Sequence, residues 1–385
     1  MLYFFERKGI CEIELHNSVT QDDREHLELL LDKNYVAFKI TFALLYTVPR
    51  EVTLLLYRAL KEQRKDITLI TYRSKLNRYF HRLGFQSSFI SQLGYELTNM
   101  KQEKLYSYEI QLLTSYKSDE ELLRYLFSEI EKRYGYNFTH YKEDMLHRRF
   151  SLFKIKHSIK NSNDAVALIL LRRVAFLSFF LDLSINVTEF FRNPYSYREL
   201  SSLLEAKYRY TKRLKIWSAG CSSGKEAYSI AMILDSINML QKTLIYATDF
   251  NKFVLEDAKA ALYSLAAYKR AIENAKKIGF ENYIKNYIVK NDSFMYVKQH
   301  IVKNLLFLDH NLTKDSSFNE FDIIMCRNVL IYFEDNLQKK VFSLLYESLR
   351  FGGYLFLGES EILHSDFREK FVEYDLKYKI YKKVA

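Results

Sequence analysis

The second half of the chain, from about residue 195 onward, predicts an α/β fold with an open, doubly wound sheet. Short apolar runs typical of buried strands occupy 215–220, 244–250, 321–328 and 353–360. Stretches with a helical spacing of apolar residues separate these runs, and the one at 337–350 lies directly before the last of them. Ligands of such sheets bind at the carboxyl ends of the strands, so the residues that follow each run are the first candidates for a site.

The middle of the chain predicts helices only. Helical patterns cover 118–135, 141–160 and 163–183, and the candidate N-cap regions are Ser118 to Glu121 and the pair Asn163 and Asp164. The most apolar window, 165–183, is interrupted by Arg172 and Arg173, which favours a buried helix pair over a membrane span. We therefore expect an all-α subdomain at 118–194, followed by the sheet domain at 195–385.

The first hundred residues predict a small α/β unit of their own. Strand patterns at 3–7, 10–17, 35–42 and 66–72 alternate with helical patterns at 20–33, 49–63 and 74–85, the last of which ends at Gly84. This order resembles the STAS domains, small modules of sulfate transporters and anti-sigma-factor antagonists. The Asp-Ser-Ser-Gly turn that can be phosphorylated in that family is missing from 43–52, where Thr47 stands nearby. We therefore expect a module at 1–100 that docks a signalling partner, joined to the rest by a linker at 101–117.

Composition excludes several classes of protein. A chain of 385 residues with 48% hydrophobic residues can bury a sizeable core in two or three domains, so disorder is not expected. The formal net charge of +11 is spread along the chain, so nucleic acid is not favoured as a partner. The cysteines, Cys11, Cys221 and Cys326, match neither a disulfide framework nor a zinc pattern. Without a signal-peptide pattern at the start, we expect a cytoplasmic protein with no metal and no membrane insertion.

A glycine turn, GCSSGKE at 220–226, joins the first strand of the sheet domain to a helical pattern. A phosphate loop needs four residues between its glycines and a hydroxyl residue after its lysine. Here the spacer is one residue short, and Glu226 occupies the hydroxyl position, where its charge would repel phosphate. The dinucleotide fingerprint fails as well, because Ser222 stands in the place of its second glycine.

The turn suits a ligand that lacks phosphate and carries some positive charge. S-adenosylmethionine fits, because acidic residues can bind its amino group and its ribose hydroxyls, and its sulfonium is cationic. Asp249 ends the next strand, at the place where the ribose hydroxyls would lie. The same position also suits an N-cap of the helix that follows, and the two roles can coexist. Asp249 therefore indicates a ligand that contains adenosine, but it does not indicate which reaction is catalysed.

Six stretches of the chain together resemble the motifs of one protein family. They are NVTEFFRNP, WSAGCSSGKEAYSIAM, YATDFNKFVLEDA, DHNL, FDIIMCRNVLIYF and LRFGGYLFLGESE. In this order they resemble the CheR-type chemoreceptor glutamate methyltransferases, and the resemblance covers about residues 118–385. It implies a class I S-adenosylmethionine-dependent methyltransferase fold, a doubly wound sheet with an antiparallel last strand, preceded by a small all-α subdomain. It also implies a β-hairpin inserted near 280–308.

The resemblance implies a cofactor site drawn from several of these stretches. Its residues are Asn186, Thr188, Arg192, Glu226, Asp249, Asn311, Leu312, Arg327 and Asn328. Arg192 can fork onto the methionine carboxylate, which lysine does less well, while Asn186 and Thr188 can bond the same amino-acid end of the cofactor.

The other end of the cofactor has its own predicted contacts. Asn311 and the Leu312 backbone suit the adenine edge, and Asn328 follows a strand close to where the methyl group should sit. Tyr332 can stabilise the positive sulfonium with its aromatic face. Arg192 and Tyr332 are therefore the catalytic candidates, and both act by shaping the site.

Methyl transfer to a glutamate side chain needs no general base, since that carboxyl group, with a pKa of about 4.3, is already ionised at neutral pH. We therefore expect catalysis by positioning in a site that excludes water. His310 is accordingly predicted to be structural, Phe190 and Phe191 to be packing residues, and Cys221 and Cys326 to be small buried hydrophobes.

The helical segment at 141–160 is rich in basic residues, namely Lys142, Arg148, Arg149, Lys154, Lys156, His157 and Lys160. A basic helix face is usually only solvated. The resemblance implies that this helix faces acidic chemoreceptor cytoplasmic domains, with Arg149 the best-matched position. We therefore expect Arg148 and Arg149 to bind the substrate.

The chain departs from the family in two places. Family members commonly have Glu-Glu-Pro where this chain has Lys225, Glu226 and Ala227, and we expect the lysine to be a surface substitution. The hairpin region lacks the glycines of members that grip a receptor's C-terminal pentapeptide, so the resemblance does not extend to that grip. Two alternatives stay open: a catalytically inactive, cofactor-binding signalling scaffold, and a methyltransferase that acts on RNA or a small molecule.

Overall fold

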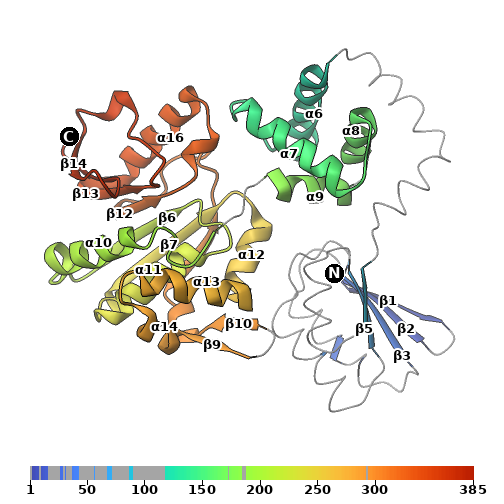
Figure 1. Cartoon of the computed structure of the whole chain (residues 1–385), viewed down its shortest axis with the longest axis horizontal. Coiled ribbons are helices and arrows are strands. Elements are labelled where there is room, and N and C mark those ends of the chain that lie inside the picture. Colours follow the sequence, from blue (N-terminus) through green and yellow to red (C-terminus); the bar gives the residue numbers. More distant parts are fainter. Residues whose placement is uncertain are drawn as a thin grey trace. The chain divides into compact units, whose positions relative to one another are not determined.

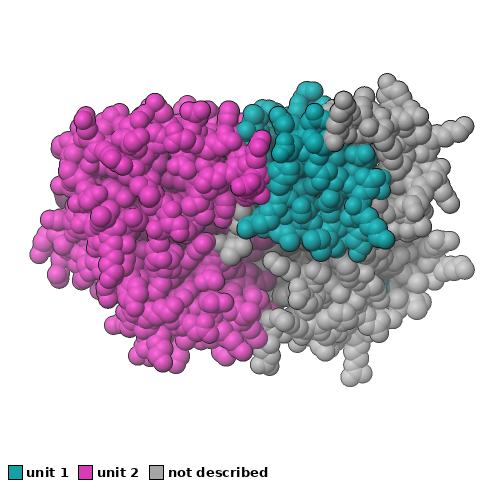
Figure 2. Space-filling view, turned by 45° about the horizontal axis from the view of Figure 1, so that its top comes forward, with its two compact units in different colours: residues 1–139, 146–185 teal, residues 140–145, 186–385 magenta. Residues whose placement is uncertain are grey.

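The computed structural model describes residues 2–7, 10–15, 27–28, 31, 37–42, 56, 67–71, 86–89, 118–171, 173–183, 188–291 and 294–385. Contacts within the chain divide it into two compact units, which Figure 2 colours separately. The first unit contains Met1–Thr139 and Leu146–Ile185, and the second contains His140–Met145 and Asn186–Ala385. The segment His140–Met145 thus belongs to the second unit, although it lies between two segments of the first along the chain.

The N-terminal part of the first unit contains a five-stranded sheet in sequential order (Figure 1). Its strands are β1 (Leu2–Arg7), β2 (Ile10–Leu15), β3 (Ala37–Phe42), β4 (Ile67–Thr71) and β5 (Gln86–Phe89). β1 and β2 pair antiparallel, and the other neighbours pair parallel. The sequence predicted four of these strands and missed β5. The predicted helices and linker lie mostly or wholly outside the described residues, and the STAS-like interpretation stays a prediction.

The other described elements of the first unit are helices, namely α6 (Asp119–Tyr134), α8 (Ser162–Leu171), α9 (Arg173–Leu183) and all but the first three residues of α7 (Glu143–Lys156). The predicted N-cap is confirmed, because the Ser118 side chain accepts a hydrogen bond from the Glu121 N–H at 3.2 Å. The N-cap predicted at Asn163 and Asp164 is wrong, because α8 begins at Ser162 and Asn161 Oδ1 accepts a hydrogen bond from the Asn163 N–H at 3.0 Å. The apolar window forms the predicted helix pair, and none of the described helices is long and apolar enough to cross a membrane.

The second unit is built on a seven-stranded sheet with the order β11-β7-β6-β12-β13-β15-β14. Its strands are β6 (Leu214–Ala219), β7 (Thr243–Asp249), β11 (Leu305–Asp309), β12 (Phe321–Cys326), β13 (Leu349–Leu357), β14 (Phe371–Asp375) and β15 (Ile380–Lys383). The strands from β11 to β13 pair parallel, whereas β15 is antiparallel to both of its neighbours. From β6 the order steps outward to β7 and β11 on one side and to β12 and β13 on the other, and the last strand, β15, is inserted antiparallel between β13 and β14. This order confirms the predicted doubly wound sheet with an antiparallel last strand.

Helices cover both faces of this sheet (Figure 1). Successive side chains of a strand point to opposite faces, and both faces of the central strands are apolar. Ile216 and Ile323 pack in the core cluster that contains α11, while their neighbours Trp217 and Ile324 pack in the cluster that contains α16. The bounds of these and the remaining elements are α10 (Tyr195–Leu203), η1 (Leu204–Tyr208), α11 (Lys225–Ser236), η2 (Leu240–Lys242), α12 (Lys252–Ala260), α13 (Leu265–Lys276), α14 (Glu281–Tyr287), α15 (Gln299–Val302), η3 (Leu330–Tyr332), α16 (Asp335–Ser348) and η4 (Ser365–Phe367).

A second, small sheet is inserted between β7 and β11. It has the order β8-β10-β9, with β8 (Leu262–Ser264), β9 (Ile288–Lys290) and β10 (Phe294–Val297). β10 pairs antiparallel with both neighbours, so β9 and β10 form a hairpin. The carboxyl ends of β6, β7, β11 and β12 meet at one edge of the main sheet, where the predicted cofactor residues lie.

Candidate active site at the carboxyl edge of the sheet

The glycine turn lies at the carboxyl end of β6, between that strand and α11. Gly220 has a φ of +75° and Gly224, the N-cap residue of α11, has a φ of +78°, a left-handed backbone that glycine adopts at little cost. The N–H groups of Gly220 and Cys221 donate to the Thr248 carbonyl at 2.9 and 2.8 Å. The turn is therefore fastened to the end of β7, beside Asp249.

Asp249 is buried and holds two backbone segments. Its Oδ2 accepts a hydrogen bond from the Ser222 N–H at 2.8 Å, and its Oδ1 accepts one from the Asn251 N–H at 2.9 Å. The N-cap of α12 is Asn251, whose side chain accepts from the Phe253 N–H, so an N-cap role for Asp249 is wrong. Burial raises the pKa of Asp249 to about 6, although the two N–H donors act in the opposite direction.

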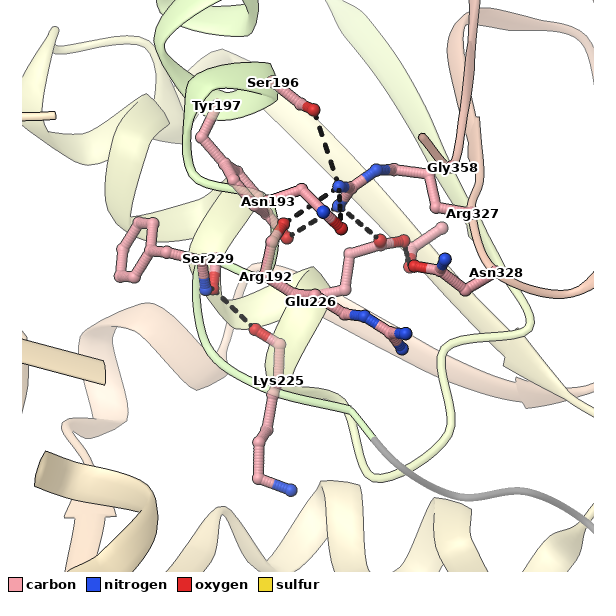
Figure 3. Close-up of polar contacts among 12 residues, drawn as sticks. Arg192, Asn193, Ser196, Tyr197, Lys225, Glu226, Ser229, Arg327, Asn328 and Gly358 are labelled. Atoms are coloured by element: carbon pink, nitrogen blue, oxygen red, sulfur yellow. Dashed lines mark hydrogen bonds and ion pairs between the residues drawn. The ribbon is translucent and has the colours of Figure 1, made fainter. Parts of the chain in front are cut away.

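A buried ion pair joins α11 to the end of β12. Glu226 Oε2 accepts a hydrogen bond from Arg327 Nη1 at 3.2 Å, as Figure 3 shows. The other carboxylate oxygen, Oε1, accepts from the Ser218 hydroxyl at 2.8 Å. Burial raises the pKa of Glu226 above the usual range of glutamate, and the Arg327 guanidinium opposes this shift. The side chain of Arg327 is only 1% exposed, so the pair is withdrawn from water.

Arg327 also holds the loop that leads into α10. Its Nη2 donates to the Arg192 carbonyl at 2.9 Å and to Asn193 Oδ1 at 3.3 Å, and its Nη1 donates to the Tyr197 hydroxyl at 3.3 Å. Phe191 and Asn193, on either side of Arg192, have φ values of +52° and +55°, which cost energy in residues other than glycine. The hydrogen bonds of Arg327 in Figure 3 stabilise this backbone conformation and so determine the position from which the Arg192 side chain extends.

The predicted residues of this loop have different surroundings. Thr188 and Arg192 are half-buried, and Asn186 lies outside the described residues. Phe190 and Phe191 are buried, which confirms their prediction as packing residues. The loop therefore has an apolar side that packs on the sheet unit and a polar side that carries Thr188 and Arg192.

The segment after β11 carries the residues predicted for the adenine edge. Leu312 is buried, and Asn311 is half-buried with its Oδ1 accepting from the N–H and the hydroxyl of Thr313 at 2.9 and 2.8 Å. Asn311 can therefore offer its side-chain NH₂ group to a ligand. His310 packs edge-on against Trp217, with ring centroids 5.4 Å apart, and its Nε2 lies 3.1 Å from a backbone carbonyl. This environment agrees with the structural role predicted for His310.

Two predicted residues follow β12. Asn328 is half-buried with a φ of +59°, and Tyr332 is half-buried at the end of η3. The Lys142 N–H donates to the Tyr332 carbonyl at 3.0 Å, and the Glu334 N–H donates to the His140 carbonyl at 3.0 Å. The segment His140–Met145 therefore lies against the loop that carries the predicted catalytic tyrosine.

Tyr141 belongs to this site, although no sequence motif indicated it. It forms an isolated β-bridge with Phe333, and the two rings meet edge-on with centroids 5.0 Å apart. It packs against the same core cluster as Leu312 and Tyr332. Burial raises the pKa of the Tyr141 phenol above its usual range, and the negative charge of Asp249 adds to the shift. Only the fold reveals this neighbourhood, because Tyr141 is far from the other site residues in sequence.

Comparison with known proteins identifies the family. Residues 186–380 match the family model described as the CheR methyltransferase SAM binding domain. The chain belongs to the CheR methyltransferase family. It is 32% identical over 254 residues to the putative methyltransferase Cher3 of Pseudomonas putida, covering 65% of this chain and 91% of that protein.

Other CheR relatives carry a name that includes chemotaxis. The chain is 38% identical over 186 residues to the chemotaxis protein methyltransferase of Vibrio anguillarum, covering 46% of this chain and 65% of that protein. It is 31% identical over 238 residues to the chemotaxis protein methyltransferase of Listeria monocytogenes, with coverages of 61% and 88%. Among solved structures, it is similar to magnesium protoporphyrin IX methyltransferase from Synechocystis PCC 6803 with bound SAM, at 12% identity and a TM-score of 0.30, covering 70% and 99%.

As a CheR methyltransferase, the chain has the predicted class I fold and uses the predicted cofactor, S-adenosylmethionine. The residues at the carboxyl edge fit this molecule. Asp249 supplies a buried carboxylate for a cationic ligand with a ribose diol, whereas both carboxylate oxygens of Glu226 accept hydrogen bonds within the protein. Ser222 Oγ is buried and has no hydrogen-bond partner among the described residues, while the Ser222 N–H donates to Asp249 Oδ2.

Lys225, where this CheR chain departs from the family, was predicted to be a surface substitution, but it is partly buried. Its Nζ donates to Ser223 Oγ at 2.8 Å, and it lies 4.8 Å from the centroid of the Tyr263 ring. Cys221 and Cys326 are buried hydrophobes as predicted, and burial raises the pKa of both thiols. Within the described part of the chain, no cluster of three His, Cys, Asp or Glu side chains could hold a metal.

The residues predicted to bind the substrate lie on α7. Arg148 is exposed and Arg149 is half-buried. On the same helix, Leu152 and Ile155 are exposed apolar residues. This basic and apolar surface belongs to the first unit, whereas the cofactor residues belong to the second.

Proposed function

We propose that this CheR methyltransferase transfers the methyl group of S-adenosylmethionine to glutamate side chains of chemoreceptor cytoplasmic domains. The observation that carries the proposal is the carboxyl edge of the sheet, where the buried carboxyl group of Asp249 binds the glycine turn, in a family whose relatives include chemotaxis methyltransferases. Buried carboxylates favour a cationic methyl donor and disfavour a phosphate-bearing one.

Each residue has a proposed role. Asp249 accepts hydrogen bonds from the ribose hydroxyls, while Asn311 and the Leu312 backbone bind the adenine edge. Arg192 binds the methionine carboxylate, with Thr188 beside it and Asn186 contributing to the same end. Arg327 and Glu226 position the loop of Arg192 rather than contact the reacting atoms, which agrees with the hydrogen bonds that both groups make inside the protein.

The reaction needs alignment more than acid–base chemistry. S-adenosylmethionine supplies a methyl group that the substrate carboxylate takes up as the carbon–sulfur bond breaks and its electron pair stays on sulfur. The substrate glutamate is ionised at neutral pH, so no side chain has to remove a proton. The site residues exclude water, align the two reactants and place Tyr332 where its aromatic face stabilises positive charge.

The direct test combines the full chain, labelled S-adenosylmethionine and a chemoreceptor cytoplasmic fragment. We expect base-labile methyl esters that release methanol on treatment with alkali. A receptor fragment whose glutamates are replaced by alanine serves as the control. Cofactor binding without transfer would contradict the proposal and favour a catalytically inactive scaffold.

Charge reversal on α7 tests the substrate surface. We expect R148E/R149E to raise the KM for the receptor fragment roughly tenfold, because like charges would then face the acidic receptor helices. The increase should shrink at high salt, which screens exposed charges. The matched control is K212E/R213E, an adjacent pair of exposed basic residues on the second unit. Equal effects of the two double variants on KM would show that α7 has no special role.

The pH dependence of cofactor binding tests Asp249. Because its pKa is raised to about 6, this carboxyl becomes neutral as the pH falls through that value and then attracts the cationic cofactor less. We expect the Kd for S-adenosylmethionine, measured by calorimetry, to be about tenfold higher at pH 5 than at pH 7. D249N should bind more weakly at pH 7 and show a flat profile. A wild-type Kd that stays constant over this range would exclude Asp249 as the titrating ligand.

A further inference from the structure

A further buried carboxylate, that of Glu361, lies at the site and has no role assigned so far. Glu361, 3% exposed, follows β13, and each of its oxygens accepts two backbone hydrogen bonds. Oε1 accepts from the N–H groups of Val329 and Leu330, both at 2.8 Å. Oε2 accepts from the N–H groups of Asn328 at 2.9 Å and Gly358 at 2.6 Å. One side chain therefore satisfies three successive amides of the loop after β12 and one amide of the loop after β13.

The loop held by Glu361 is the one that carries the residues nearest to the proposed chemistry. It starts at Asn328, whose φ of +59° is uncommon for a residue other than glycine, and it continues into η3, which ends at Tyr332. The two loops approach so closely that a Cβ at Gly358 would lie 2.7 Å from Glu361 Oε2 and 2.9 Å from the Asn328 nitrogen. Side-chain packing alone does not explain this arrangement, since the contacts are backbone amides around a charge.

The negative charge of Glu361 is buried, and burial of a charge has a cost that other contacts must offset. Glu361 adds to the upward shift of the pKa of Glu226, a shift whose main cause is burial. Two buried carboxylates near one arginine repel each other, and burying a charge costs free energy unless it is hydrogen-bonded. Four N–H donors offset that cost. A neutral glutamine could not do the same, because its NH₂ group would face two N–H donors instead of accepting from them.

We propose that Glu361 is a positioning residue for methyl transfer, whose carboxylate fixes the backbone from Asn328 to Leu330 and thereby places Asn328 and Tyr332 against the reacting groups. The inference rests on the proposed methyltransferase activity. Its chemical basis is that donors and aromatic groups accelerate a displacement only when they are already aligned, and a displacement of about 1 Å can cost on the order of a hundredfold in rate.

The test compares E361Q with E359Q in the full chain. Glu359 is exposed two residues earlier, so E359Q makes the same charge change at a side chain that binds none of the four amides. We expect E361Q to lower kcat for receptor methylation about 10- to 100-fold, with the KM for the receptor within about twofold. The Kd for S-adenosylhomocysteine should rise measurably. Selective ¹⁵N labelling should show the amide protons of Val329 and Leu330 shifted downfield in the wild type and in E359Q, and shifted upfield in E361Q.

A purely structural role predicts a different pattern. It would lower the Tm of E361Q but leave kcat near that of the wild type at temperatures well below the Tm, and this result would overturn the proposal. If E361Q does not fold, G358A serves as the second test. The added Cβ would displace the Glu361 carboxylate and the Asn328 amide, while the negative charge of Glu361 is kept. A folded G358A with unchanged kcat would overturn the proposal as well.

Failure of the proposed function is distinguishable from failure of this inference. A wild-type chain that methylates no receptor fragment would refute the substrate assignment alone. The affinity for S-adenosylhomocysteine then decides the role of Glu361. An unchanged Kd in E361Q, despite the loss of the downfield amide signals, would refute the positioning role, and a raised Kd would support it.

Discussion

Replacement of Arg327 by methionine is expected to lower the free energy of unfolding by about 3–5 kcal/mol, because it leaves the Glu226 carboxylate buried without its partner. The guanidinium is 1% exposed and bonds Glu226, the Arg192 carbonyl and Tyr197, so no water can replace it without opening the site. Urea unfolding monitored by the fluorescence of Trp217, the sole tryptophan and buried in the second unit, measures the loss.

The double variant E226Q/R327M separates the charge effect from the positioning effect. It removes the uncompensated carboxylate, and glutamine can still accept a hydrogen bond from the Ser218 hydroxyl. We expect the double variant to recover most of the lost stability, since a buried ion pair can often be replaced by neutral groups at little cost. Methylation should stay low in both variants, because the Arg192 loop has lost its anchor. Equal stability of the single and double variants would contradict the charge explanation.

The fold could be predicted because its signals are local. The central strands are buried on both faces, so Ile216 with Trp217 and Ile323 with Ile324 appear in the sequence as continuous apolar runs. β5 was missed because its sequence, QSSF, contains no apolar alternation. The helix pair after Ser162 was predicted from the arginines that interrupt its apolar window, a pattern that a membrane span does not tolerate.

The candidate site could be predicted only in part. Glu226, Asp249, Arg327 and Asn328 follow strands that the sequence reveals, and parallel strands bring their carboxyl ends to one edge. What the sequence could not show is which partner each side chain chooses. Asp249 suited an N-cap, but Asn251, two residues later, caps the helix and leaves Asp249 to bind the turn.

Tyr141 and Glu361 were missed for a related reason. Tyr141 reaches the site through a β-bridge to Phe333, a contact between segments far apart in sequence. The Glu361 carboxylate accepts hydrogen bonds from backbone amides. Every residue except proline has a backbone amide, so a sequence motif cannot indicate these partners. Both residues lie in stretches that the resemblance had already marked, Glu361 in LRFGGYLFLGESE and Tyr141 at the start of the basic helix, so the fold adds their roles rather than their positions.

The glycine turn gives the second large effect. Alanine at Gly224 would carry a φ of +78°, and its Cβ would lie 2.8 Å from the Ala258 Cβ and 3.1 Å from Phe307 Cε1. The left-handed backbone and the overpacking together should lower the free energy of unfolding by about 2–5 kcal/mol. The shift needed to relieve the contact would move the start of α11 and the Ser222 amide bound by Asp249. We therefore also expect the Kd for S-adenosylmethionine to rise.

Gly279 provides the matched control within the same unit. Its φ is +70°, but a Cβ there would meet nothing within 4 Å, so G279A carries the backbone cost of about 1–2 kcal/mol without the collision. We expect G279A to bind the cofactor like the wild type. If G224A and G279A lose equal stability by Trp217 fluorescence and bind the cofactor equally well, the close packing of α12 and β11 around the turn is not what requires glycine. A larger loss in G224A would mean that the second glycine of the turn serves the packing beneath the cofactor, while the acidic residues around it select the ligand.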